Sequence, residues 1–335
     1  MLNKFLLSLF IVAISFLSIN AQEENPDVEK LRFELFSTYG YCKSQDWTFQ
    51  RIADGFPELK LEIIQAKAEF DITFGQSCTN VQNIISKILG SKLAEYDKTL
   101  KDRLADAIDY SKLNFQSSQS FINKVRERAK GNIESPFKES LLAFNPTFAE
   151  NPGAEFSRGF TKKYRTNNHP KAKGLDFEIS VPISWKAREG NRPNVIQFFK
   201  EKNGYGNTYM LLMVLEIPTL NGIKPTQKEI DSIFTSRGLK EFIPENGTFI
   251  EGKPIVLEGQ KGAMLTYDMV EQRLELKLRL RFLSYIVYYK SRLIMIQFAT
   301  SGKEEDTESI VKEFVKNRPL FQLVANSFIL MDKYK

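Results

Sequence analysis

Histidine is almost absent from this chain, which has a single one, His169, among 335 residues. Zinc sites that use imidazole combine it with further histidine, cysteine or carboxylate ligands. A catalytic triad places its histidine between a nucleophile and an acid. His169 stands in a polar segment directly before Pro170. We therefore interpret it as a loop residue and expect neither a metal site nor a catalytic group there.

Cysteine is also scarce, since Cys42 and Cys78 are the only two. In an oxidising compartment such a pair can form and keep a disulfide; two small buried residues on helices are the alternative. A cysteine–histidine nucleophile would have to join residues from two predicted domains. No glycine-rich loop of the kind that binds nucleotide phosphates is found. The sequence thus predicts no catalytic residue, no metal and no cofactor.

Long apolar runs are limited to one segment near the N-terminus. Residues 5–19 are almost continuously apolar, Lys4 precedes them, and the small residue Ala21 follows. This pattern is typical of a secretory signal peptide, so we predict one at residues 1–21 and an exported protein, periplasmic or secreted. An uncleaved anchor is the alternative, although the run is shorter than the ~20 residues that span a bilayer. No transmembrane segment is expected after cleavage.

Charge is unevenly distributed along the chain. Residues 22–150 contain 17 basic and 20 acidic residues, whereas residues 151–335 contain 29 basic and 21 acidic residues. The basic excess therefore belongs to the C-terminal half. Because an exported protein rarely meets nucleic acid, we expect an acidic protein or an anionic surface as the partner, and no nucleic acid.

Residues 22–145 carry apolar residues at helical spacing and predict an antiparallel helical bundle. In one helix a first apolar stripe is widened by a second, and such breadth predicts burial on more than one side. The second stripe consists of Leu61, Ile64, Ala68 and Ile72. A linker is predicted at residues 146–157, where Asn-Pro and Asn-Pro-Gly sequences interrupt the helical pattern.

From residue 158 to 335 the period of the apolar pattern changes from 3.6 to 2, which indicates strands. Residues 175–181 alternate and stop at Pro182, and we expect the later strands to complete the same sheet. The most regular alternation lies at residues 273–282, which predict one half-exposed strand.

Helix starts are predicted where a hydroxyl residue precedes a glutamate by three positions. Thr226 and Glu229 form one such capping box, and Ser301 and Glu304 form another. Pro319 is expected to interrupt the terminal helix, because proline removes a backbone donor.

Taken together, these patterns predict an α+β fold: an N-terminal antiparallel helical bundle, then a mostly antiparallel sheet flanked by helices. The strand Gly174–Trp185, the antiparallel meander and a closing helix with Ala325-Asn326-Ser327-Phe328 resemble the PsbP/Mog1-type α/β/α sandwich over residues 158–330. Members of that group are mostly binding or assembly factors rather than enzymes; the group includes photosystem extrinsic subunits, a Ran-binding protein and bacterial exported proteins of unassigned role. The resemblance implies a binding role and no catalytic residues.

Basic residues in and near the predicted 273–282 strand form the candidate binding surface. Arg273, Lys277, Arg279 and Arg281 would share one sheet face, with Arg292 adjacent across a hairpin. A solvated sheet face is the alternative, because charges also discourage unwanted strand pairing.

The sequence as a whole predicts an exported, non-catalytic binding or assembly factor of the cell envelope that docks an acidic protein or an anionic surface. The alternative hypothesis is a carrier of a small apolar or lipid-like ligand, based on the 27 Phe and 12 Tyr residues. An enzyme of unknown class is the third hypothesis.

Overall fold

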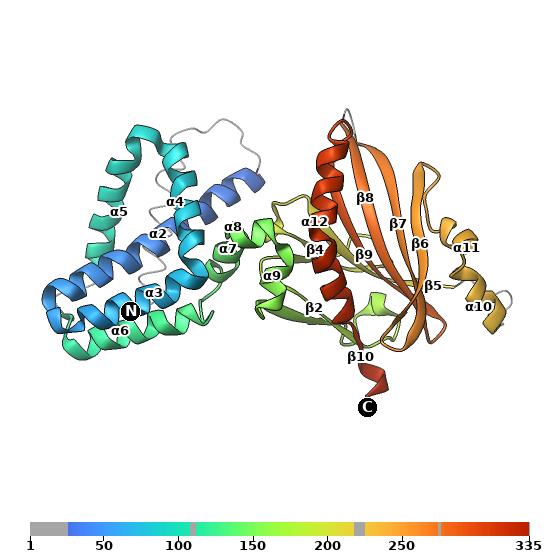
Figure 1. Ribbon diagram of the computed structural model, residues 1–335, viewed down its shortest axis with the longest axis horizontal. Helices are drawn as coiled ribbons and strands as arrows, with labels where there is room; N and C mark the ends of the chain where they lie inside the picture. Colours follow the sequence, from blue (N-terminus) through green and yellow to red (C-terminus); the bar gives the residue numbers. More distant parts are fainter. Residues whose placement is uncertain (1–25, 108–111, 218–224, 274–275, 335) are drawn as a thin grey trace. The chain divides into compact units, whose positions relative to one another are not determined.

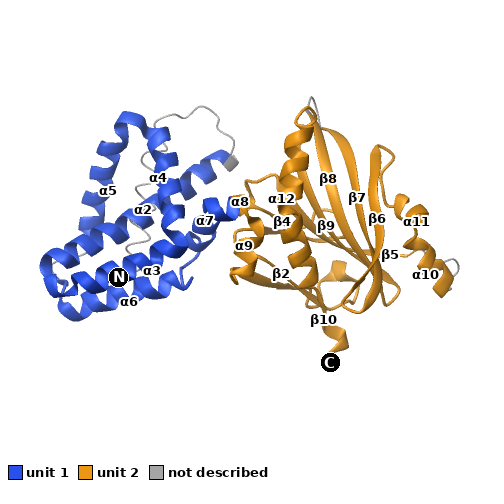
Figure 2. Ribbon diagram, viewed as in Figure 1, with its two compact units in different colours: residues 1–149 blue, residues 150–335 orange. Residues whose placement is uncertain are grey.

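The structure, a computed structural model, describes residues 26–107, 112–217, 225–273 and 276–334. The predicted signal peptide at residues 1–21 lies outside them. The chain divides into two compact units, residues 1–149 and residues 150–335 (Figure 2). The predicted linker, residues 146–157, falls at this division and contains two short helices, α8 (Pro146–Glu150) and α9 (Pro152–Ser157).

The described part of the first unit is helical, as its 3.6-residue period predicts (Figure 1). Helix α2 packs against α4 and α7, and α3 packs against α6. A π-helical turn, η3, joins α3 to α4 without a break in the helical path. The elements are α2 (Pro26–Gly55), α3 (Lys60–Phe70), η3 (Asp71–Gly75), α4 (Gln76–Leu89), α5 (Leu93–Ala107), α6 (Phe115–Ala129) and α7 (Phe137–Ala143).

One face of α3 corrects the sequence prediction. Ile63, Ala66 and Phe70 are buried as expected. The second stripe is exposed instead, with Leu61 and Ile72 at 65% and 81% of their full accessibility. The prediction of burial on more than one side was therefore wrong, because the apolar pattern of a helix does not reveal how many neighbours pack against it.

The second unit contains two antiparallel sheets. The larger has the strand order β3-β4-β5-β9-β8-β7-β6, and the smaller has the order β1-β2-β10. The larger sheet consists of β3 (Lys186–Glu189), β4 (Val195–Lys200), β5 (Thr208–Glu216), β6 (Gly247–Leu257), β7 (Gln260–Arg273), β8 (Leu276–Tyr289) and β9 (Arg292–Lys303). The smaller consists of β1 (Thr161–Arg165), β2 (Phe177–Pro182) and β10 (Ile329–Leu330). The predicted α+β fold is confirmed.

Two hydrophobic cores cover the two faces of the larger sheet. On one face, α12 (Thr307–Asn326) stacks Phe321 on Phe298 of β9, with ring centroids 4.5 Å apart, and the smaller sheet adds Phe177 to the same core. On the other face, α10 (Gln227–Ile233) and α11 (Ser236–Lys240) contribute Ile230 and Leu239. Figure 1 shows α12 across the sheet and the two short helices beside β6.

The strand at residues 175–181 forms as β2, and its apolar side chains are buried. It pairs with β1 and β10, however, and not with β3 to β9, which form the larger sheet. The expectation that one sheet would contain all these strands was wrong. Alternation identifies a strand and its buried face, whereas the partner strand is set by contacts distant in sequence.

The predicted strand at residues 273–282 is in fact divided between two strands. β7 ends at Arg273 and β8 begins at Leu276, and these two residues are paired across the hairpin. Residues 274–275 and the side chain of Arg273 lie outside the described part. The alternation continued through the connection, and it therefore did not mark the end of β7.

Helix starts were predicted with mixed success. Thr226 and Glu229 form the expected capping box at the start of α10. Ser301, by contrast, lies in β9, and α12 begins only at Thr307. The terminal helix also continues through Pro319. These two predictions were wrong.

A disulfide joins Cys42 of α2 to Cys78 of α4. The cross-link restricts the unfolded chain over a sequence separation of 36 residues. We predict that Cys42→Ala with Cys78→Ala lowers the unfolding free energy of the first unit by about 3–4 kcal/mol. Urea denaturation followed by Trp47 fluorescence, in a Trp185→Phe background, measures that unit by itself. An unchanged midpoint would contradict a stabilising role.

Candidate functional site

At the centre of the predicted basic surface, an acidic residue of the same fold neutralises the charge of Arg281. Arg281 of β8 lies opposite Asp268 of β7. Its Nε and Nη2 atoms donate to the two Asp268 carboxylate oxygens at 2.7 and 2.8 Å. Both side chains are largely buried, at 19% and 16% of full accessibility. This bidentate pair has the geometry of a structural ion pair between two strands.

The neighbouring cations are also engaged. Lys277 lies 3.6 Å from a Glu304 carboxylate oxygen, and Arg279 Nε donates to the Glu304 backbone carbonyl at 3.4 Å. Arg292 Nη2 lies 3.4 Å from Glu216 Oε1.

Strand register also separates the five predicted residues. Arg281 is paired with Thr300, whereas Arg292 is paired with Tyr289, eight residues further along β8. At about 3.3 Å per residue this is about 26 Å. The pairing of Arg273 with Leu276 also takes its position out of the row that contains Lys277, Arg279 and Arg281. The five residues therefore do not form one surface.

A different basic surface lies at the β3 edge of the larger sheet, and we call it the β3–β4 surface. Lys186 is directly paired with Lys200, and Arg188 is directly paired with Phe198. Directly paired residues project from the same face of a sheet. Two like charges are thus placed side by side on neighbouring strands, an arrangement that costs free energy unless a partner compensates it.

Two aromatic rings extend this surface from β4 onto β5. The Arg188 guanidinium lies over the Phe198 ring, 4.3 Å from its centroid. Phe198 is in turn stacked on Tyr209, with centroids 5.3 Å apart and an interplanar angle of 25°. Arg188 is exposed and the two rings are half-buried. Arg188, Phe198 and Tyr209 therefore form one stack, with the charged guanidinium group at the edge strand β3.

Three cations in and between β3 and β4 differ from Lys277, Arg281 and Arg292, which each have a carboxylate partner. Within the described part of the chain, no carboxylate lies within ion-pair distance of Arg188, Arg192 or Lys200. The acidic residues nearby in sequence are already used: Glu189 pairs with Lys171 at 2.9 Å, and Glu201 is buried. The β3–β4 surface therefore retains positive charge that the fold itself does not neutralise.

A buried carboxylate positions the segment that leads into β3. Glu155 of α9 accepts hydrogen bonds from the Ser184 backbone N–H at 2.9 Å and from the Ser184 hydroxyl at 2.6 Å. Lys162 of β1 donates to the carbonyl oxygens of Ile183 and Trp185. Burial raises the pKa of the Glu155 carboxyl to about 7, although the hydrogen bonds from Ser184 oppose the shift.

A second buried carboxylate positions the turn after β4. Glu201 accepts hydrogen bonds from the backbone N–H groups of Asn207 and Thr208, both at 2.9 Å. A Cβ atom at Gly206 would lie 2.1 Å from Cγ of the buried Glu201, so a larger residue there would displace that side chain. The Asn203 N–H donates to the Ser184 carbonyl, and this bond connects the turn to the segment that Glu155 holds.

Sequence reasoning missed this surface. The available signal was a run of five cations between residues 186 and 202, but β3 is only four residues long and has no apolar alternation. The pairing of Lys186 with Lys200 also depends on strand register, which the residues themselves do not specify.

In the ranges that the structure describes, no group of three or more histidine, cysteine, aspartate or glutamate side chains is arranged to hold a metal ion. His169 Nδ1 accepts a hydrogen bond from the Lys171 backbone N–H at 3.2 Å, so the side chain caps its own turn. None of the helices in the described ranges is long and apolar enough to cross a membrane.

Neither a protein-family model nor a curated protein matches the sequence. Solved structures do match, each over about half of this chain. A PsbP from the cyanobacterium Synechocystis is 19% identical and matches over 51% of this chain and 94% of its own, with a TM-score of 0.31. LpqN, described as involved in cell envelope biogenesis of Mycobacterium tuberculosis, is 7% identical over 53% and 96%, with a TM-score of 0.31.

The Ran-binding protein Mog1p of Saccharomyces cerevisiae is 8% identical and matches over 52% of this chain and 97% of its own, with a TM-score of 0.33. Both groups named in the predicted resemblance, PsbP and Mog1, are thus among the similar structures. Likeness at this level concerns the path of the chain and not its activity.

The raised pKa of Glu155 predicts a pH dependence of stability. The folded carboxyl keeps its proton up to about pH 7, whereas the unfolded carboxyl loses it near its ordinary value of 4.5. The folded state therefore binds more protons between these values, and its unfolding free energy falls as pH rises through that window, by on the order of 3 kcal/mol.

Trp185 fluorescence in a Trp47→Phe background measures this dependence for the second unit. Glu155→Gln removes the titrating group, so we expect a flatter profile between pH 4.5 and 7. Glu245→Gln, which changes an exposed carboxyl of the same unit, serves as the matched control and should leave the profile unchanged. Equal slopes in both variants would contradict the role given to Glu155.

Proposed function

We propose that the protein is an exported, non-catalytic binding protein that docks an acidic partner protein through the β3–β4 surface. The observation that carries this proposal is that Arg188 and Lys200 on this surface, and Arg192 in the loop between β3 and β4, lack a carboxylate partner in the described part of the fold. The export and envelope location rest on the predicted signal peptide at residues 1–21.

Charge pairing separates this surface from the one predicted at first. A cation that already holds a carboxylate must give up that pair before it binds a new one, so the net gain is small. Arg281, held by both oxygens of Asp268, is an example. Arg188 has no such pair to break, and its ring contact leaves guanidinium N–H groups available for a bidentate carboxylate.

Protection of the sheet edge explains part of the same charge. Lysine and arginine on an edge strand hinder pairing with other sheets, and this accounts for Lys186 and Arg188 on β3. It does not account for Lys200, which lies on β4 inside the edge. The charge of Lys200 on the second strand therefore favours a surface that attracts acidic groups.

An acidic protein fits this surface better than a lipid bilayer does. Insertion into a bilayer requires apolar side chains that project from the surface. Here the aromatic rings are stacked on one another and half-buried, while Arg188 and Arg192 are exposed. A flat face with charged groups outermost suits electrostatic docking of another folded surface.

The test uses a fluorescein-labelled oligoglutamate peptide and fluorescence anisotropy at low ionic strength. We predict binding by the full chain and a loss of about tenfold in affinity for Arg188→Glu with Lys200→Glu, because each reversal replaces an attraction by a repulsion. Added salt should weaken the wild-type complex.

Lys277→Glu with Lys290→Glu is the matched control. It changes the net charge equally, but both lysines already pair with acids, Glu304 and Asp332. Affinity should change little. An equal loss in both double variants would show that net charge alone drives binding, and binding to phosphatidylglycerol vesicles without binding to the peptide would favour a lipid surface. Either result would overturn the proposal.

A further inference from the structure

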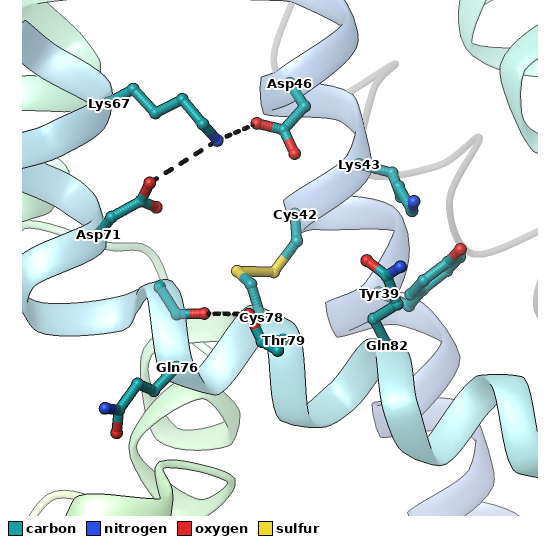
Figure 3. A pocket seen from close by; sticks show the side chains of 11 residues that line it. Tyr39, Cys42, Lys43, Asp46, Lys67, Asp71, Gln76, Cys78, Thr79 and Gln82 are labelled. Atoms are coloured by element: carbon teal, nitrogen blue, oxygen red, sulfur yellow. Dashed lines mark hydrogen bonds and ion pairs between the residues drawn. A yellow bond between two sulfur atoms is a disulfide. The ribbon is translucent and has the colours of Figure 1, made fainter. Parts of the chain in front are cut away.

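A cleft of about 370 Å³ opens in the first unit between α2, α3 with its π-helical turn η3, and α4 (Figure 3). Its volume lies at the small end of the range for ligand sites in proteins. π-Helical turns occur often at functional sites, and here η3 supplies Asp71 and Gly75 to the wall. This cleft is independent of the β3–β4 surface, which belongs to the other unit.

The disulfide fixes two walls of the cleft relative to each other. Cys42 and Cys78, both half-buried, contribute to the lining from α2 and α4. Figure 3 shows the sulfur atoms between the two helices, with Lys67 and Asp71 facing them from α3 and η3. A cross-linked wall keeps its shape when the cleft is empty, which lowers the cost of ordering the site around a ligand.

The residues that line the cleft include two carboxylates, Asp46 and Asp71, and two lysines, Lys43 and Lys67. Lys67 Nζ lies 2.5 Å from Asp46 Oδ1 but 3.8 Å from Asp71 Oδ2. A single ammonium thus serves two carboxylates and makes a hydrogen bond with Asp46 alone. The charge of Asp71 is only partly compensated, and burial together with the charge of Asp46 raises its pKa although Lys67 lowers it.

The other lysine of the lining does not supply the missing charge. Lys43 Nζ lies 4.0 Å from Asp97 Oδ2 and 5.3 Å from the centre of the Tyr39 ring. The Tyr39 hydroxyl donates to Asp97 at 2.7 Å. Lys43, Tyr39 and Asp97 therefore form a group of their own, and Asp46 and Asp71 remain with one cation between them.

We propose that this cleft binds a small polar ligand that carries a primary amine, with its ammonium group beside Asp71, the carboxylate that Lys67 compensates least. An ammonium group donates three hydrogen bonds, and charge-assisted hydrogen bonds of this kind are the strong ones. Gln76, Thr79 and Gln82 also line the cleft, and their amide and hydroxyl groups suit the hydroxyl groups of an amino sugar.

The lining also bears on the hypothesis of an apolar ligand. Besides the disulfide, the residues that line the cleft are almost all charged or carry amide or hydroxyl groups. An acyl chain placed there would leave those groups without hydrogen-bond partners. The cleft therefore favours an amine-bearing polar molecule over a lipid-like one.

Glucosamine and glucose form a matched pair of probes, because they differ in one amine. Saturation-transfer NMR with the full chain should detect glucosamine and give a signal at least about tenfold weaker for glucose, since one charge-assisted contact is lost. Spermidine, a second amine, should compete with glucosamine for the cleft.

Asp46→Asn with Asp71→Asn should reduce glucosamine binding by about tenfold or more. Asp102→Asn, which changes an exposed carboxylate of α5 outside the cleft, is the control and should keep wild-type binding. The wild-type protein should also lose glucosamine as pH falls and Asp71 is protonated, a readout that does not depend on how the variants fold.

Three results would overturn the assignment: equal binding of glucose and glucosamine, no binding of either amine, or unchanged binding in the double variant. None of them affects the oligoglutamate experiment, because that experiment reports on the other unit. Failure of this proposal and failure of the docking proposal are therefore separate outcomes.

Discussion

The buried Glu155 carboxylate is the contact on which the surface of the second unit most depends. It holds the Ser184 N–H and hydroxyl, and the Ser184 carbonyl accepts from Asn203 in the turn that Glu201 organises. Both ends of the β3–β4 hairpin are thus tied to buried carboxylates. Removing a carboxylate from water costs free energy unless hydrogen bonds replace its hydration. Here the hydrogen bonds that replace it also hold in place the segments on either side of an edge strand only four residues long.

Local patterns in the sequence were sufficient where the controlling contacts are local. The capping box at Thr226 and Glu229 joins residues three positions apart, and alternation correctly identified β2 and its buried face. Local patterns could not predict which strands or charged residues pair. β2 pairs with β1 and β10, and the Asp268–Arg281 ion pair joins two strands across a hairpin. The candidate basic residues were chosen by their charge, which cannot show whether a carboxylate lies across the strand.

Two different uses of charge emerge in the two units. In the first, a cross-linked helical wall surrounds a cleft in which Asp46 and Asp71 share the Lys67 ammonium. In the second, Arg188 of β3 and Lys200 of β4 lie on neighbouring strands, and among the described residues no carboxylate lies within ion-pair distance of either. In both places the fold keeps like charges close together, which costs free energy in the isolated protein. A binding partner of opposite charge would recover that cost.

The most direct test of the docking surface is a hydrogen–deuterium exchange footprint of the full chain with and without the oligoglutamate peptide. We predict slower exchange that is confined to residues 186–202. These residues comprise β3, β4, the turn between the two strands and the first residue of η7 (Lys202–Gly204). Backbone amides at a docked surface exchange more slowly because their opening is suppressed. Slower exchange centred on residues 277–292, or none in the second unit, would contradict it.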